Sequence, residues 1–345
     1  MYRYIHLIIE RRNKMEQSFS ALIVDKKSEE QVEASVQELT LNDLPEGDVL
    51  IRVHYSGVNY KDSLASIANG NIVTSYPFVP GIDLAGVVVS SDSPDFKEGD
   101  RVIATSYDIG VSHFGGYSEY ARIRSEWIVP LPQNLTLKEA MIIGTAGFTA
   151  ALSVHRLEEN HTSPSNGSVL VTGATGGVGS FAVAILSKLG YTVEASTGKS
   201  SEAAYLKELG ASSIVAREDV YNGKLKTLGK QKWAAAVDPV GGEPLASVLS
   251  QIQYGGSVAV SGLTAGGKVP TTVFPFILRG INLLGIDSVY CPMPTRKEIW
   301  NRLANDFKPE SFEPFIQQEI SLQQLPEVLP TLLKGQARGR TIVKL

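Results

Sequence analysis

Residues 169–179, Val-Leu-Val-Thr-Gly-Ala-Thr-Gly-Gly-Val-Gly, decide the fold of this 345-residue chain. A short apolar run is followed by three glycines in a GxxGxxG spacing, and an apolar, helix-forming segment begins directly after them. A strand, a glycine turn and a helix in this order bring free backbone N–H groups and the positive end of a helix dipole close to a pyrophosphate. We therefore predict a dinucleotide site, rather than a glycine turn without a ligand, and its residues are Thr175, Gly176, Gly177 and Val178.

Two different patterns of predicted secondary structure divide the chain on either side of residue 135. Towards the C-terminus, short apolar strands alternate with helical segments as far as residue 261, the pattern of a doubly wound parallel α/β sheet. Before residue 135, short β segments are punctuated by glycine and proline, and Val49, Ile51, Val53 and Tyr55 alternate with Leu50, Arg52 and His54. These segments predict a compact β-barrel domain. Thr136 and Glu139 have the spacing of a capping box and predict the start of a helix that reaches about Glu159.

Composition and charge exclude several classes of partner. The formal net charge is −4, without a block of basic residues, so the sequence gives no reason to expect a nucleic-acid partner. No apolar run reaches membrane-spanning length, and we expect no membrane partner. Cys291 is the only cysteine of the chain, so an internal disulfide and a multi-cysteine zinc site are both excluded. A reducing cytoplasm fits this composition.

The choice of cofactor is predicted from the end of the strand that follows the glycine loop. A site for NAD requires an acidic residue there to bind the ribose hydroxyls. This chain has Ser196-Thr197-Gly198-Lys199 instead, with Arg217 beyond the next strand. Hydroxyls, a glycine and cations suit a 2′-phosphate, so we predict NADPH with Thr197, Gly198, Lys199 and Arg217 as ligands. The alternatives are solvated surface cations and a role for Glu194, which we interpret as a strand residue that faces away from the ribose.

Several motifs together resemble the medium-chain dehydrogenase/reductase superfamily. They are Tyr55-Ser56-Gly57-Val58-Asn59-Tyr60-Lys61-Asp62, Pro80–Gly86, Gly144–Ala150 and the glycine loop, in that order. More narrowly, the chain resembles the YhdH/YhfP group of quinone oxidoreductases and acrylyl-CoA reductases. Matches to this group include Ala236–Gly242, Pro275–Arg279, Gly285–Val289 and Gly339-Arg340. The resemblance spans about Phe19 to Leu345.

The resemblance implies a zinc-free member of the superfamily. Zinc-dependent alcohol dehydrogenases have a cysteine ligand where this chain has Asn59, and a histidine ligand where it has Ile82. Neither asparagine nor isoleucine can replace a thiolate or an imidazole as a zinc ligand. We therefore expect no metal, and a reaction that does not proceed through a zinc alkoxide.

The implied fold has two domains around a cleft. A GroES-like β-barrel substrate domain covers 19–138 and is completed by 291–345, and a Rossmann domain at 139–290 binds NADPH. Residues 1–18 form an atypical N-terminal extension. The family also places Thr145 against the nicotinamide, and it places Leu263, Ser288 and Arg338 around the cofactor.

Without a metal, the resemblance implies hydride transfer from NADPH to an activated alkene. Hydride adds to the β-carbon of an α,β-unsaturated carbonyl compound, and negative charge builds on the carbonyl oxygen. Tyr60 and Asn59 are the predicted catalytic residues, because they stand at the position of the metal in the zinc enzymes. Tyr60 should then face the nicotinamide, and it is also a predicted cofactor-binding residue. The alternative for Tyr60 is a packed aromatic ring with a satisfied hydroxyl. Asp83 is a weaker candidate, because a buried acid beside a glycine can simply cap backbone groups.

The acceptor and the assembly are left open by these motifs. An acrylyl-CoA-like enoyl thioester is favoured, an NADPH:quinone oxidoreductase is the alternative enzyme, and an NADPH-binding sensor or structural protein is the alternative outside catalysis. The apolar run Ile281–Ile286 is expected to form the last strand of the parallel sheet, with an edge that a second copy covers in a homodimer.

We also expect that translation begins at Met15, since the resemblance starts only near Phe19 and the segment Glu10–Lys14 is compatible with a ribosome-binding sequence in the gene.

Overall fold

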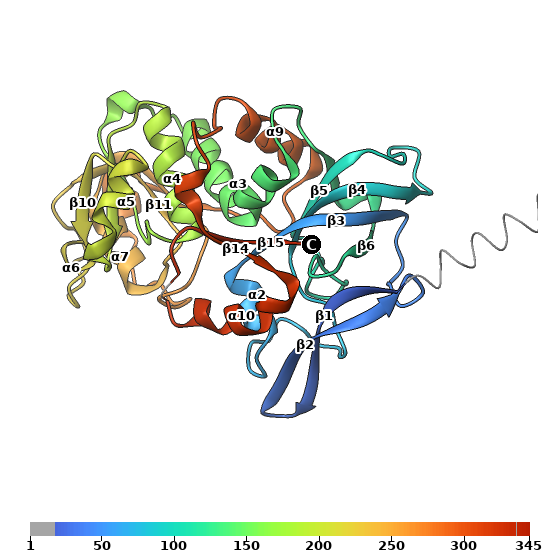
Figure 1. Ribbon diagram of the computed structural model, residues 1–345. Coiled ribbons are helices and arrows are strands. Elements are labelled where there is room, and N and C mark those ends of the chain that lie inside the picture. Colours follow the sequence, from blue (N-terminus) through green and yellow to red (C-terminus); the bar gives the residue numbers. More distant parts are fainter. Residues whose placement is uncertain (1–17, 336) are drawn as a thin grey trace, which may run out of the picture. The chain divides into compact units, whose positions relative to one another are not determined.

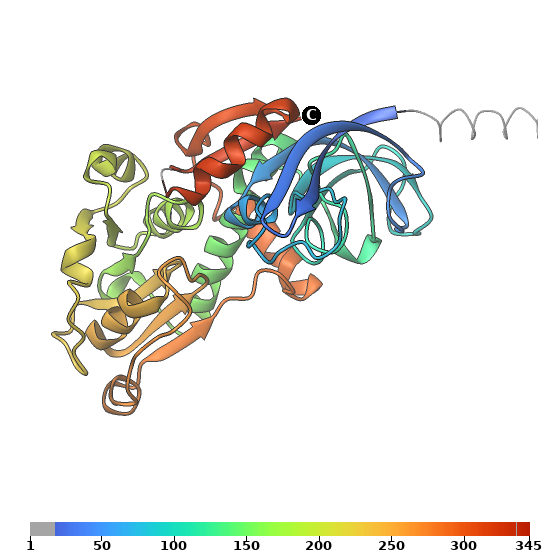
Figure 2. The same ribbon diagram turned by 90° about the horizontal axis from the view of Figure 1, so that it is seen from below.

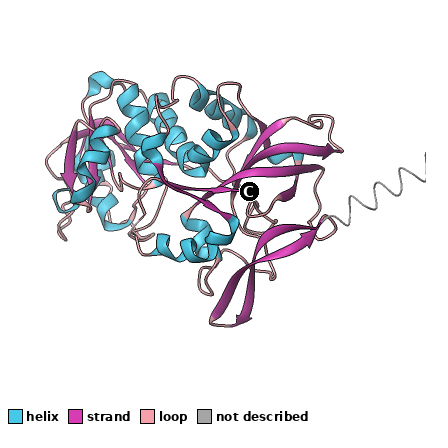
Figure 3. Ribbon diagram, viewed as in Figure 1, coloured by secondary structure: helices cyan, strands magenta, loops and turns pink. Residues whose placement is uncertain are grey.

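The computed structural model describes residues 18–335 and 337–345. The predicted start at Met15 and the extension before it lie outside these residues. Contacts between Cα atoms divide the chain into two compact units. Unit 1 runs to Thr145 and is completed by Gln318–Ala337 and Thr341–Leu345, and unit 2 comprises Ala146–Gln317 and Arg338–Arg340. Figure 1 labels the elements of both units, and Figure 3 shows that strands dominate unit 1 whereas helices accompany the sheet of unit 2.

Unit 1 is built from antiparallel strands. Two strands, β1 (Ser18–Ser28) and β2 (Gln31–Thr40), form a hairpin, and a larger sheet has the strand order β14-β15-β3-β4-β5-β7 with β6 paired to β3. The larger sheet consists of β3 (Val49–Val58), β4 (Asp83–Ser91), β5 (Arg101–Thr105), β6 (Tyr120–Ile123), β7 (Ile128–Pro130), β14 (Ile316–Ser321) and β15 (Arg340–Lys344). Two helices complete the unit, α2 (Tyr60–Ala65) and α10 (Leu325–Leu333).

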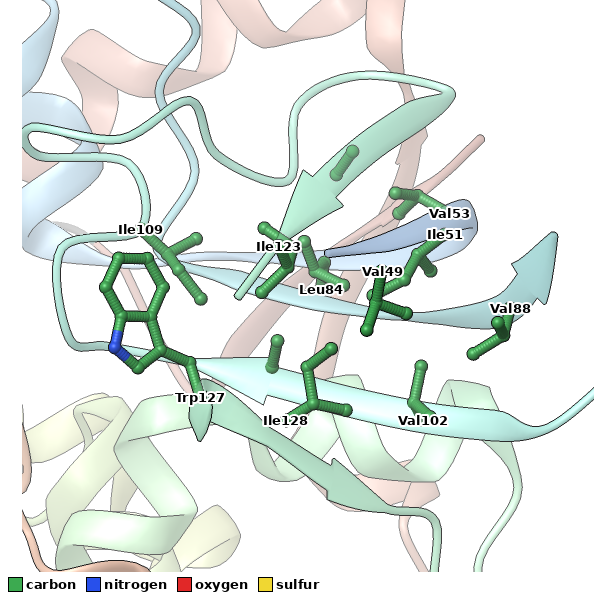
Figure 4. Packing of buried hydrophobic residues seen from close by; sticks show 12 residues of the cluster. Val49, Ile51, Val53, Leu84, Val88, Val102, Ile109, Ile123, Trp127 and Ile128 are labelled. Atoms are coloured by element: carbon green, nitrogen blue, oxygen red, sulfur yellow. The ribbon is translucent and has the colours of Figure 1, made fainter. Parts of the chain in front are cut away.

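The core of unit 1 follows from the alternation in β3. Val49, Ile51 and Val53 are buried, and the intervening Leu50 and Arg52 are not, as the period of two predicts. Figure 4 shows their side chains directed towards those of β4, β5 and β7, with Trp127 closing one end of the cluster. The strand β2 was not predicted, because its residues are largely polar and it lacks a periodic apolar pattern.

Unit 2 contains a six-stranded parallel sheet in the order β10-β9-β8-β11-β12-β13. Its strands are β8 (Val169–Val171), β9 (Val193–Thr197), β10 (Ser213–Ala216), β11 (Trp233–Asp238), β12 (Ile252–Val260) and β13 (Asn282–Gly285). Its helices are α4 (Gly177–Lys188), α5 (Ala203–Glu208), α6 (Arg217–Val220), α7 (Gly242–Gln251), α8 (Phe274–Arg279) and α9 (Met293–Ala304). The strand order reverses between β8 and β11, the switch point at which doubly wound sheets bind ligands.

Helix α3 (Leu137–Glu159) was predicted as continuous, but its backbone breaks at Gly144, where φ is 50° and ψ is −160°. Its start agrees with the predicted capping box, since Glu139 accepts a hydrogen bond from the backbone of Thr136 and donates its own N–H to the threonine hydroxyl. By length and composition α3 is apolar enough to cross a membrane, but 78% of that window is buried within the protein, as in a core helix.

The division into units differs from the predicted domains at three places: residues 139–145 belong to unit 1, residues 338–340 belong to unit 2, and the largest difference is over residues 291–317. These residues belong to unit 2 and not to the β-rich unit. The reason is aromatic packing: the Trp300 and Phe148 rings stack at 6.0 Å, the Arg296 guanidinium lies 4.8 Å from the Phe148 ring, and Phe315 stacks on Phe181 at 4.2 Å. Contacts of this kind are not apparent in a linear pattern of residues.

Candidate functional site

In unit 1, the predicted catalytic residues stand at the start of α2. Asn59 is the N-cap of this helix and Tyr60 is its first residue. Half of the Tyr60 surface is exposed. The alternative of a packed aromatic ring is therefore disfavoured, and the ring is accessible to a ligand. Asn59 is buried, and its Nδ2 donates to Asp83 Oδ2 at 2.8 Å, so one of its two amide hydrogens is already committed.

The carboxylate of Asp83 accepts several hydrogen bonds. Besides Asn59, the backbone N–H of Thr145 donates to Oδ2 at 2.9 Å, and the Thr145 hydroxyl donates to Oδ1 at 2.5 Å. The Ser106 hydroxyl lies 3.1 Å from the Thr145 hydroxyl. Asp83 thus contacts two of the predicted site residues, and it is more than the local backbone cap considered above. Ser106 was not predicted, because nothing in its neighbourhood in the sequence signals this contact.

A second buried carboxylate, Asp62, holds the α2 turn. Its Oδ2 accepts the Asn59 N–H at 2.8 Å and its Oδ1 accepts the Ile82 N–H at 2.9 Å. Burial, together with the charge of Asp83, raises the pKa of Asp62 to about 7, although the hydrogen bonds donated to this carboxyl group oppose the shift. Asp62 therefore fixes the backbone at the two positions, 59 and 82, that resemble metal-ligand positions of zinc enzymes. Among residues 18–335 and 337–345, no group of three or more His, Cys, Asp or Glu side chains is arranged to hold a metal ion.

In unit 2, the glycine loop connects β8 to α4 as predicted. Gly176 is the N-cap of α4, and Gly177 and Val178 form its first turn. A Cβ atom on Gly179 would lie 2.4 Å from the carbonyl oxygen of Gly173, so only glycine permits this approach of helix to loop. Thr175 is buried, and its carbonyl oxygen accepts the Gly339 N–H at 3.0 Å. The loop is therefore tied to the segment that contains Arg338.

At the end of β9, two cations converge. A Cβ atom on Gly198 would lie 2.5 Å from Arg217 Nη2 and 2.7 Å from its Cζ, so the guanidinium packs on the glycine backbone. Burial lowers the pKa of Lys199, the charge of Glu202 opposes this, and that of Arg217 lowers it further. The Lys199 N–H donates to the Thr197 hydroxyl at 2.9 Å. Like charges brought together in this way favour an anion between or beside them.

Glu194 does not compete with this cation pair. Its Oε2 accepts a hydrogen bond from Trp233 Nε1 at 2.8 Å. This contact within the sheet agrees with the prediction that Glu194 faces away from the ribose. The acidic residue that the sequence did not predict is Glu202, which pairs with Arg338 at 3.5 Å. The Arg338 guanidinium also lies 4.9 Å from the Tyr205 ring.

The remaining predicted residues of unit 2 have different surroundings. The Ser288 hydroxyl accepts a hydrogen bond from the Thr149 hydroxyl at 2.8 Å, and the backbone carbonyl of Ser288 accepts one from buried Arg296 at 2.9 Å. Leu263 is 69% exposed in the loop after β12. Ser288 is thus held firmly by its neighbours, whereas Leu263 offers apolar surface to a ligand or partner.

Comparison with known proteins identifies the family. Residues 45–133 match the alcohol dehydrogenase GroES-like domain, and residues 177–305 match the zinc-binding dehydrogenase domain. YhfP of Bacillus subtilis is 61% identical over 95% of this chain and 99% of its own. The acrylyl-CoA reductase AcuI of Ruegeria pomeroyi is 49% identical over 94% of this chain and 98% of its own.

Solved structures agree with these relatives. The structure of YhfP with NAD bound superposes with a TM-score of 0.93 at 60% identity, covering 96% of this chain and 100% of that one. The yhdH oxidoreductase of Salmonella enterica in complex with NADP gives 0.92 at 47% identity, covering 94% and 99%. The chain is therefore an oxidoreductase of the medium-chain dehydrogenase/reductase superfamily, and within it belongs to the YhdH/YhfP group. The predicted combination of a GroES-like domain with a Rossmann domain is confirmed.

The buried Asp62 predicts a specific pH dependence of stability. Its pKa is about 7 in the folded protein and near 4 in the unfolded chain, so the unfolded chain releases this proton first as pH rises. Between pH 4 and 7 this residue therefore lowers the free energy of unfolding by about 1 kcal/mol per pH unit. Asp62→Asn removes the effect. We expect the free energy of unfolding of the wild type, minus that of the variant, to fall from pH 4.5 to 7 and to level off above pH 7, as measured by urea denaturation. A difference that stays constant over this range contradicts the prediction.

Proposed function

We propose that this protein is a zinc-independent, NADPH-dependent reductase that transfers hydride to the β-carbon of an α,β-unsaturated carbonyl compound. An acrylyl-CoA-like thioester is the favoured acceptor. The observation that carries this choice is the 49% identity to the acrylyl-CoA reductase AcuI over nearly the whole chain. A quinone is the alternative acceptor, since YhfP carries a quinone oxidoreductase name.

The residues of unit 2 fit NADPH. The cation pair of Lys199 and Arg217, the glycine beneath the guanidinium and the engagement of Glu194 by Trp233 all suit a 2′-phosphate. We assign the pyrophosphate to Thr175, Gly176, Gly177 and Val178, where backbone N–H groups begin α4. Arg338, Leu263 and Ser288 complete the proposed set. When bound, NADPH supplies the hydride, and the protein supplies binding, orientation and electrostatics.

The residues of unit 1 fit the other requirements of the reaction. As hydride adds to the alkene, negative charge develops on the carbonyl oxygen and must meet hydrogen-bond donors. Tyr60 offers an exposed hydroxyl, and Asn59 is held by Asp83 in one orientation. We propose that the Tyr60 hydroxyl donates to the developing oxyanion, or passes the proton that the α-carbon requires. Asn59 and Ile82 lack the ligand chemistry of zinc, so the proposed reaction relies on these donors instead.

A panel of acceptors tests the proposed function. Oxidation of NADPH is followed at 25 °C with acryloyl-CoA, crotonyl-CoA, a benzoquinone and a simple aldehyde, with and without a chelator. We expect the highest kcat/KM with acryloyl-CoA, and turnover that the chelator does not change, because no step requires a metal. Preference for the quinone selects the alternative enzyme. Turnover of none of the four acceptors, together with tight NADPH binding, selects the sensor or structural protein.

Cofactor preference depends on the cation pair. We expect Lys199→Ala to weaken NADPH binding by about 10- to 100-fold, because a charge-assisted phosphate contact contributes about 1.5–3 kcal/mol. NADH has no 2′-phosphate, so its affinity should stay unchanged. Gly198→Ala should have a similar effect, because its methyl group displaces the end of the flexible Arg217 side chain and leaves the backbone in place.

Both affinities are measured by calorimetry, and Lys224→Ala, which removes an exposed cation elsewhere in unit 2, is the control. The comparison of NADPH with NADH is important because YhfP was solved with NAD bound. Equal affinity of wild type for NADPH and NADH, with no effect of Lys199→Ala, contradicts the assignment.

Tyr60→Phe separates chemistry from binding. A donor to a developing oxyanion acts mainly in the transition state, so we expect kcat to fall about 100-fold while the affinity for NADPH changes little. Single-turnover kinetics with the best acceptor of the panel measures the chemical step. Tyr254→Phe, at an exposed tyrosine of unit 2, is the matched control. An unchanged rate with every reactive acceptor excludes the proposed role of the Tyr60 hydroxyl.

We also propose a homodimer formed through the edge of the unit 2 sheet. The edge strand is β13, and exposed apolar side chains lie on it and on the preceding α8 segment: Val273, Phe274, Ile277, Leu278 and Leu283. Figure 2 shows this orange part of the chain at the margin of the sheet. A row of unpaired backbone groups beside apolar surface suits a self-complementary interface between two copies.

Light scattering at micromolar concentration tests this proposal. We expect twice the chain mass of 37.2 kDa for the wild type. Leu283→Lys places a charge in the proposed interface and should raise the dimer dissociation constant by at least about 100-fold. An exposed substitution away from this edge, Leu225→Lys, is the control. A monomeric wild type contradicts the proposal.

A further inference from the structure

The break in α3 leaves the backbone N–H of Thr145 without the helical partner it would have in a continuous helix. Gly144 adopts a left-handed φ of 50°, and the helix resumes after it. The Thr145 N–H instead donates to Asp83 Oδ2, on β4, at 2.9 Å. Asp83 therefore serves as the cap of the second half of α3, where a negative charge is also favoured by the helix dipole.

The same carboxylate determines which way the Thr145 hydroxyl points. A threonine hydroxyl has a single hydrogen, and that of Thr145 is donated to Asp83 Oδ1 over 2.5 Å. The donors to Asp83 include Asn59 and the Thr145 N–H on Oδ2 and the Thr145 hydroxyl on Oδ1, an arrangement that suits an acceptor-only carboxylate. The contact between Ser106 and Thr145 then has one possible direction: Ser106 donates and Thr145 accepts.

The backbone at Ser106 holds its hydroxyl group beside Thr145. Ser106 and its neighbour Tyr107 have φ values of 65° and 50°, a conformation that side chains other than glycine adopt at a cost. The Ser106 N–H is anchored on the Ile82 carbonyl at 2.8 Å. A strained turn thus delivers a buried hydroxyl to Thr145, and the hydrogen bonds run in one sense, from Ser106 through Thr145 to Asp83.

We infer that Asp83 is a positioning residue that makes the Thr145 hydroxyl a hydrogen-bond acceptor towards its ligand. Any ligand group bound by this hydroxyl must then be a donor. The inference rests on the proposed function and on the expectation from the family resemblance that Thr145 contacts the nicotinamide end of NADPH. The donors at that end are the carboxamide amino group and the ribose hydroxyls. The polarity also separates roles, since an acceptor cannot stabilise a developing oxyanion, and this task stays with Tyr60 and Asn59.

An isosteric variant inverts this polarity. In Asp83→Asn, the amide oxygen must take the position of Oδ2, because two N–H donors face it. The amide nitrogen then takes the position of Oδ1 and donates to the Thr145 hydroxyl, whose hydrogen is released towards the ligand. The substitution preserves shape and burial, but the donor group of the ligand now faces the hydrogen of the Thr145 hydroxyl, which is also a donor.

Binding by calorimetry, without any acceptor, provides the test. The ligands are NADPH and its reduced 3-acetylpyridine analogue, which lacks the carboxamide amino group. We expect Asp83→Asn and Thr145→Val to weaken NADPH binding by about 10-fold, and Thr145→Ser to retain wild-type affinity. If the carboxamide is the donor, wild type binds the analogue about 10-fold more weakly, and neither variant weakens it further. If a ribose hydroxyl is the donor, each variant weakens the binding of both ligands by the same factor.

Thermal unfolding of the free variants excludes a merely structural role. Ser153→Ala is the control, because it removes another buried hydroxyl from α3, one that donates only to the backbone carbonyl of Thr149. A lower melting temperature in Asp83→Asn with wild-type affinity for both ligands overturns the inference, as does unchanged NADPH affinity in Thr145→Val, which removes the hydroxyl itself. Failure of the proposed function has a different signature: the wild type itself does not bind NADPH or turns over no acceptor.

Discussion

The buried carboxylate of Asp83 is the interaction on which the architecture of unit 1 depends. A carboxylate removed from water is costly unless donors surround it. Here the donors come from α2 and from the second half of α3, and the backbone carbonyl of Asp83 accepts the Ser56 hydroxyl at 2.6 Å. Hydrogen bonds donated to the Asp83 carboxylate hold these elements in place. For the nearby Asp62, burial raises the pKa towards neutrality, and the charge of Asp83 acts in the same direction.

In unit 2 the constraint is an excess of positive charge at the end of β9. Arg217 packs on the backbone of Gly198, and Lys199 stands within its field. Two cations brought this close favour a nearby anion, and for this reason we propose the 2′-phosphate site here. The glycine loop adds uncharged backbone donors, and the tie between Thr175 and Gly339 connects that loop to the Arg338 segment within the same unit. Function in this family therefore depends on small groups placed by a rigid sheet.

The sequence predicted the family, the parallel sheet and the glycine loop, because each depends on local patterns. Residues 169–179 contain a strand, a turn and a helix start within one short stretch, and the strand found at 169–171 is the one expected. The sequence did not predict the hairpin strand β2, the break at Gly144 or the place of residues 291–317. Polar strand residues, a lone glycine inside an apolar helix and aromatic stacking at long sequence separation leave no periodic signal.

By itself the sequence determined which chemical groups are available: no zinc ligands at positions 59 and 82, a tyrosine and an amide in their neighbourhood, and cations without an acid at the end of β9. Only the tertiary structure decided what those groups do. It committed one hydrogen of Asn59 to Asp83, directed Glu194 to Trp233, and fixed the direction of the hydrogen bond from Thr145. The physical reason is that a hydrogen bond depends on the direction and partner of each donor. For residues 62 and 24 positions apart from Asp83, such as Thr145 and Asn59, these are set by packing and not by spacing along the chain.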